Sequence, residues 1–149
     1  MNRIDFYHLQ TQGLDNVLPK LIEKAYNSGK NIKIKVGTEE RVEFINSLLW
    51  TYSETSFIPH GSKKDGFAEL QPIWLSSDDD NPNNAQMLFL VDGAKASLGE
   101  TLKYERVLNI FDGNDAVSLE NARNYWKELK GNAETYYWQQ DNSGKWLQK

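Results

Sequence analysis

The residues best suited to chemistry in this sequence are cations that follow one another at helical spacing. Arg123, Lys127 and Lys130 are separated by four and three residues, which places them on one side of a helix together with Trp126. Arginine offers a two-pronged donor that matches a carboxylate, and the indole offers an apolar wall. The pattern indicates either a solvated helix face with acidic neighbours or a site for an acidic, hydrophobic peptide tail.

A second candidate lies in the segment from Leu49 to Gly61. This segment contains Trp50 and Phe57, although its serines, threonines, proline and glycine are typical of a loop. Aromatic side chains in a loop either fold back into the core or form an exposed patch that another protein covers. Both interpretations are open from the sequence alone.

Signals for catalysis are sparse. The chain has no cysteine, and its two histidines favour structural roles: His8 lies in a predicted strand, and His60 lies in a predicted turn. The run 93–99 lacks the Gly-Lys-Ser/Thr ending of a phosphate loop. Asp78, Asp79 and Asp80 lie among polar residues, which predicts a solvated loop instead of a metal site. We therefore expect no metal and no cofactor, and the catalytic alternative is a small α/β enzyme or nucleotide-binding protein with a site near His60.

Composition narrows the class of protein further. The net charge of −4 argues against a dedicated duplex-DNA binder, which carries a basic surface, so we expect no tight direct binding to nucleic acid. No run of residues approaches the ~18 apolar positions of a membrane span, and the first residues do not resemble a signal peptide. With 149 residues and no cysteine, the sequence predicts a cytoplasmic protein with one domain over residues 1–149.

The elements that must position these residues alternate between strands and helices. Apolar spacing predicts helices over 14–26, where Pro19 should begin or kink the helix, after Thr38, and after a turn at 112–115. Predicted strands cover 4–9, 31–36, 71–75, 87–91, 106–111 and 133–140, and Trp146-Leu147 closes the chain. We expect Lys33 and Lys35 to point outward, residues 76–84 to form an exposed loop, and the strand at 87–91 to be covered on both faces.

This order of elements indicates an α/β fold. We predict a three-layer α/β/α domain with a largely parallel, mixed sheet, similar to nucleotide-binding domains but without their motifs. In such sheets, ligands bind near the carboxyl ends of the strands.

Short motifs occur along almost the whole chain. They are Phe6-Tyr7-His8-Leu9, Leu21-Ile22-Glu23-Lys24-Ala25-Tyr26 with Gly29, Leu49-Trp50, Ser56-Phe57-Ile58-Pro59-His60-Gly61, Gln71-Pro72-Ile73, Asn109-Ile110-Phe111-Asp112-Gly113, Ala122-Arg123-Asn124-Tyr125-Trp126-Lys127 and Tyr137-Trp138-Gln139-Gln140. In their order and spacing they resemble the chi subunit of bacterial DNA polymerase III, part of the clamp-loader assembly.

The resemblance implies a subunit without catalysis of its own that bridges two proteins. One surface would bind the acidic C-terminal tail of single-stranded DNA-binding protein, and another would bind the psi subunit of the clamp loader or an equivalent protein. By position, the tail site would comprise Phe111, Leu119, Arg123, Trp126, Lys127 and Lys130. The partner face would comprise Trp50, Phe57, Ile58 and Pro59. Some chi proteins carry a basic residue early in the last long helix, where this chain has Leu119 and Glu120.

Overall fold

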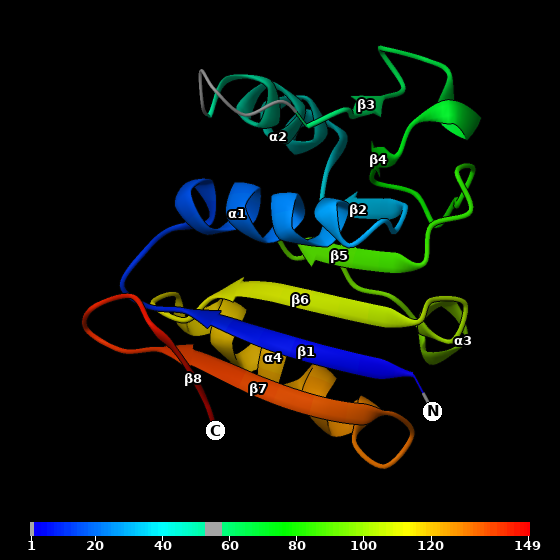
Figure 1. Ribbon diagram of the computed structural model, residues 1–149. Coiled ribbons are helices and arrows are strands. Elements are labelled where there is room, and N and C mark those ends of the chain that lie inside the picture. Colours follow the sequence, from blue (N-terminus) through cyan, green and yellow to red (C-terminus); the bar gives the residue numbers. More distant parts are fainter. Residues whose placement is uncertain (1, 53–57) are drawn as a thin grey trace.

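A single mixed sheet forms the centre of the molecule (Figure 1). The computed structural model describes residues 2–52 and 58–149. Eight strands lie in the order β3-β4-β2-β5-β6-β1-β7-β8, and among these described strands every pairing is parallel except that of β7 with β8. Their bounds are β1 Arg3–Leu9, β2 Ile32–Val36, β3 Gly61–Ser62, β4 Ile73–Ser76, β5 Met87–Val91, β6 Arg106–Asp112, β7 Glu134–Gln140 and β8 Trp146–Gln148.

Helices cover the two faces of this sheet, as Figure 1 shows. Helices α1 (Leu14–Asn27) and α2 (Glu39–Thr51) bury their apolar residues against one face, and α4 (Ala116–Leu129) packs on the other. Two short elements, α3 (Leu98–Thr101) and a 3₁₀ turn at Ala68–Leu70, complete the set. All five residues of β5 are buried, as predicted for a strand covered on both faces. The three-layer α/β/α prediction is therefore confirmed. No helix in the described residues is both long enough and apolar enough to cross a membrane.

The helix ends follow local sequence signals in most places. Thr38 Oγ1 accepts a hydrogen bond from the Arg41 amide at the start of α2, and Asp115 accepts one from the Ser118 amide at the start of α4. Gly29, with φ +86°, follows the end of α1.

Helix α1 does not begin near Pro19, which was one of the two predicted alternatives. The helix begins at Leu14 and contains Pro19, five positions further on. Proline in a helix interior loses one backbone hydrogen bond and costs about 3 kcal/mol. The turn before Pro19 buries Val17 and Leu18 against the sheet, and burial of each such side chain contributes roughly 1.5–3 kcal/mol. The apolar stripe therefore outweighs the proline.

The prediction for the lysines of β2 was wrong. Lys33 is completely buried and Lys35 is 7% exposed, on the sheet face opposite α1 and α2. Lys33 Nζ donates hydrogen bonds to the carbonyl oxygen of Asp78 at 2.9 Å and to Oδ1 of Asp80 at 2.7 Å. The polar segment after β4 therefore folds over this part of the sheet, where the prediction had placed solvent.

Lys35 is held by a second set of acceptors. Its Nζ donates to Asp79 Oδ1 at 2.5 Å and to Oε1 of the buried Glu100 at 3.0 Å. In the same segment Asn83 is only 2% exposed, and its amide donates to the carbonyl oxygens of Ile32 and Gln71. The aspartates that the sequence assigned to a solvated loop thus neutralise buried cations.

Candidate functional site

The position of α4 follows from the order of the strands. The chain runs from β6 through α4 to β7, and β1 lies between these two strands in the sheet. The helix therefore crosses over β1. The Phe6 ring of β1 contacts two aromatic side chains of α4, with its centroid 5.9 Å from that of Tyr125 and 5.3 Å from that of Trp126.

Four aromatic rings gather where β1, β6 and β7 approach their carboxyl ends. We call His8, Phe111, Trp126 and Tyr137 the aromatic shelf. The His8 ring lies 5.2 Å from that of Phe111 and 5.9 Å from that of Tyr137, and the rings of Trp126 and Tyr137 are 5.8 Å apart. Phe111 is almost fully buried, whereas the other three are half-buried. The shelf therefore offers apolar ring surface beside α4.

Close backbone packing fixes the histidine of this shelf. Gly113 follows β6 and donates its amide to the Leu9 carbonyl oxygen at 2.8 Å. A Cβ atom at Gly113 would lie 1.9 Å from Cδ2 and Nε2 of His8, so only glycine fits. On the other side of the ring, His8 Nδ1 lies 2.7 Å from the Tyr137 hydroxyl oxygen. The imidazole is thus held between two neighbouring strands.

The predicted cations lie beside the shelf. Arg123 and Lys127 are exposed on α4, and Lys130 is exposed at the residue that ends the helix. Within the described ranges, none of these three side chains has a hydrogen-bond or ion-pair partner. Glu128, which could have neutralised the stripe, instead pairs with Lys95 at 2.9 Å.

Arg123 acts electrostatically on the shelf. Burial, and then the positive charge of Arg123, lowers the pKa of His8 below its usual value. Burial raises the pKa of Tyr137, and Arg123 opposes that rise. Leu119, one turn before Arg123, is half-buried and packs against the same core. The arrangement can hold a carboxylate at the guanidinium and an apolar ring against the shelf.

Most of the residues predicted for a tail site therefore lie near one another, and two further aromatic side chains lie beside them. Leu119 and Trp126 pack against the core cluster that contains Phe111, and Arg123 lies between them on α4, with Lys127 and Lys130 further along the helix. His8 and Tyr137 were not assigned to this site from the sequence. Both occur in the motifs Phe6–Leu9 and Tyr137–Gln140, but nothing in the local pattern shows that β1 separates β6 from β7.

The second predicted face is only partly described. Trp50 is 45% exposed near the end of α2, and its ring lies 4.1 Å from that of His60. Pro59 is half-buried, and Phe57 lies outside the described residues. Ile58 is 1% exposed and belongs to the core between the sheet and the first two helices, so its side chain offers no surface to a partner. Trp50 and Pro59 are the parts of this face that the structure leaves accessible.

His60 has no nitrogen available to a substrate. The residue is 2% exposed, and its Nδ1 and Nε2 lie 2.5 and 3.0 Å from the carbonyl oxygens of Ile58 and Asn46. This is the hydrogen-bonding turn role that the sequence favoured. Across the part of the chain that the structure describes, no group of three or more histidine, aspartate and glutamate side chains is arranged to hold a metal ion.

Comparisons with known proteins identify the family of this chain. A family model described as DNA polymerase III chi subunit, HolC, matches residues 1–135. A curated relative, the probable DNA polymerase III subunit chi of Rickettsia prowazekii (strain Madrid E), is 32% identical over 111 residues. The matched region covers 74% of this chain and 66% of the relative, so the chain spans just under two thirds of the relative's length.

Proposed function

Because the chain belongs to the DNA polymerase III chi subunit family, a component of the replisome, we propose that it is a non-catalytic adaptor. It links the clamp loader to single-stranded DNA-binding protein by holding the acidic C-terminal tail of that protein. The observation that carries this proposal is an exposed arginine, unpaired within the described ranges, beside an aromatic shelf.

The proposed tail geometry follows from the contacts around Arg123. A terminal aromatic ring of the tail packs between Phe111 and Trp126, and the terminal carboxylate meets the guanidinium. Acidic residues further up the tail then face Lys127 and Lys130. The apolar and charged parts of the ligand are thus matched by neighbouring parts of one surface.

Arg123 is the residue on which tail binding depends most. Truncating one partner of a buried interfacial charge pair costs roughly 2–5 kcal/mol, and less at a rim. Because Arg123 is exposed, we expect a smaller cost of about 1.5–2 kcal/mol, so that Arg123→Ala weakens tail binding at least about tenfold. Arg123→Glu should nearly abolish it. Isothermal titration with a synthetic tail peptide measures both effects.

A charge-matched control separates the site from general electrostatics. Lys20→Glu changes the net charge by the same amount, and Lys20 is exposed on α1, across the sheet from α4. This variant should keep wild-type affinity apart from a small, salt-screened change. Equal losses in Lys20→Glu and Arg123→Glu, or wild-type affinity in Arg123→Glu, would remove this site from the proposal.

The second face is proposed to hold the psi subunit of the clamp loader or an equivalent protein. Trp50 supplies the accessible aromatic surface, and interfacial tryptophans commonly contribute about 2 kcal/mol or more. Trp50→Ala should therefore weaken the clamp-loader partner and leave tail binding intact. Phe44→Ala is a suitable control, because Phe44 is 44% exposed on the same helix. A stability loss in Trp50→Ala with partner binding unchanged would assign Trp50 to the fold alone.

We propose that the protein reaches DNA through its partner. A net charge of −4 provides little attraction for phosphates, so the isolated chain should not shift single-stranded DNA in a gel at moderate salt. It should join the complex once single-stranded DNA-binding protein is present, and not when that protein lacks its tail. The catalytic alternative near His60 is disfavoured because that imidazole is buried between two carbonyl oxygens.

A further inference from the structure

A crevice opens at the carboxyl ends of β1, β5 and β6. It has a volume of about 440 Å³, which lies in the usual range for small-molecule sites. Its position follows from the topology: the adjacent parallel strands β1 and β6 lead to α1 and α4, which cover opposite faces of the sheet. Because the connections after these two strands run to opposite faces of the sheet, a space remains outside the strand ends, and α/β sheets bind ligands at such a position.

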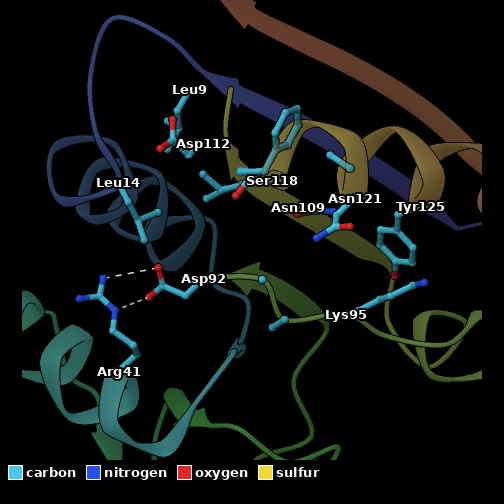
Figure 2. A pocket seen from close by; sticks show the side chains of 15 residues that line it. Leu9, Leu14, Arg41, Asp92, Lys95, Asn109, Asp112, Ser118, Asn121 and Tyr125 are labelled. Atoms are coloured by element: carbon cyan, nitrogen blue, oxygen red, sulfur yellow. Dashed lines mark hydrogen bonds and ion pairs between the residues drawn. The ribbon is translucent and has the colours of Figure 1, made fainter. Parts of the chain in front are cut away.

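The crevice and the proposed tail site use different stripes of α4. Figure 2 shows Ser118, Asn121 and Tyr125 of this helix among the side chains that line the crevice. Leu119, Arg123 and Trp126 do not line it. Of the aromatic shelf, Phe111 also borders the crevice. A ligand in the crevice would therefore lie next to the tail site and share Phe111 with it, but it would not contact Leu119, Arg123 or Trp126.

One buried side chain in the crevice lacks a partner. Asn109 of β6 is only 8% exposed, it lines the crevice, and its carboxamide has no hydrogen-bond partner anywhere in the described part of the chain. The amide nitrogen of the buried Asn83, in contrast, donates to the carbonyl oxygens of Ile32 and Gln71, although its Oδ1 has no partner among the described residues. The carboxamide atoms of Asn109 remain accessible from the crevice, and their unused donor and acceptor match a ligand that supplies both complements.

The cations that line the crevice are paired with carboxylates. Arg41 Nε pairs with Asp92 Oδ2 at 2.9 Å, as Figure 2 shows, and Lys95 pairs with Glu128. Asp112, at the end of β6, adds a further carboxylate. Each cation that lines the crevice is therefore already engaged, so a phosphate would find no unpaired positive charge there. An uncharged ligand fits better.

We infer that this crevice binds an uncharged purine nucleoside, with Asn109 as the residue that recognises the base. A carboxamide pairs in a bidentate manner with the N6 and N7 edge of adenine. Phe111, Ala122 and Tyr125, which line the crevice on the same face of the sheet, provide apolar surface for a flat ring, and Asn121 supplies a second amide at the edge of the crevice.

Adenosine is the probe that tests this inference. Titration into the isotope-labelled full chain should give saturable shifts of the Asn109 and Asn121 side-chain amide signals. Asn109→Leu should weaken binding at least about tenfold, because it removes both hydrogen-bonding groups. Asn121→Ala should weaken it several-fold, whereas Asn124→Ala, an exposed asparagine on the same helix that does not line the crevice, should not.

Related ligands and one further variant make the result decisive. Adenosine monophosphate should bind more weakly than adenosine, because its phosphate approaches Asp92 and Asp112. Uridine should also bind more weakly, since it lacks the N6 and N7 edge. Arg123→Ala should keep full adenosine affinity, which separates this site from tail binding.

The inference is overturned if adenosine at millimolar concentration causes no saturable shifts. Equal binding of adenosine and uridine would overturn the assignment of the base, and preference for the monophosphate would overturn the uncharged class. If Asn109→Leu fails to fold, equal affinities of Asn121→Ala and Asn124→Ala would still refute the site.

Discussion

Replacing Asp80 by alanine should destabilise the fold far more than replacing its neighbour Asp79. The Asp80 carboxylate accepts hydrogen bonds from Lys33 Nζ at 2.7 Å, from Ser76 Oγ at 2.6 Å and from Trp74 Nε1 at 3.3 Å. Lys33 is completely buried. Asp80→Ala therefore leaves an enclosed ammonium group with only backbone carbonyl partners.

The expected cost follows from burial. Removing one partner of a buried ion pair costs about 3–5 kcal/mol. The Asp80 side chain is 43% exposed, and Lys33 keeps a backbone acceptor at Asp78, so we expect about 2–3 kcal/mol. Asp79 is 79% exposed, and its partner Lys35 keeps Glu100 at 3.0 Å. Asp79→Ala should therefore cost less than about 1 kcal/mol.

Urea unfolding of the two single variants measures this difference directly. A double variant, Lys33→Met with Asp80→Ala, should recover most of the loss, because an apolar side chain can replace a buried pair at little cost. A loss in Asp80→Ala no larger than that in Asp79→Ala would refute the assignment of the buried pair. Failure of Lys33→Met to rescue Asp80→Ala would show that the loss comes from Ser76 and Trp74 instead.

Two further predictions concern the aromatic shelf. The pKa of His8 in the folded protein lies below its usual value, so His8 binds a proton more readily in the unfolded chain. As the pH falls below about 6.5, this difference favours unfolding, and the stability that neutral His8 contributes is lost. His8→Gln should flatten that part of the stability curve between about pH 7 and pH 5, and an unchanged slope in urea titrations would contradict the shift. Gly113→Ala should cost about 2–3 kcal/mol in thermal unfolding, because its Cβ would lie 1.9 Å from the His8 ring. Gly99→Ala, whose nearest neighbour is 3.9 Å away, should change stability little, and similar losses in both variants would show that the close approach at His8 is relieved by small shifts.

Local patterns were sufficient for most elements of the fold. Thr38 caps the second helix, glycine follows the first, and the continuous apolar run of β5 is buried, all as the sequence indicates. Helix α3 was missed, since four residues are too few to show a helical period. Ser97, which caps α3, is a residue type common at helix starts, but this signal is weak when no helical spacing of apolar residues follows it.

The lysines of β2 show where alternation misleads. A polar-apolar alternation predicts that one face of a strand is in water. In this protein that face meets a polar segment, and the carboxylates of Asp79 and Asp80 satisfy the lysines that the pattern had assigned to solvent. The lysines and the aspartates are separated by more than forty positions in the sequence, so the local pattern around one group does not indicate that it contacts the other. The run of aspartates was the available signal, because a buried cation requires an acceptor from elsewhere in the chain.

The candidate tail site combines a local and a non-local component. Helical spacing alone brings Arg123 and Trp126 onto one side of α4, and Phe111 is added because β6 ends close to the start of that helix. His8 enters only because β1 is inserted between β6 and β7, and this insertion brings a side chain from the start of the sequence beneath a helix near its end. Sequence spacing therefore indicates the charge that a ligand must carry, whereas strand order determines the ring surface against which that ligand packs.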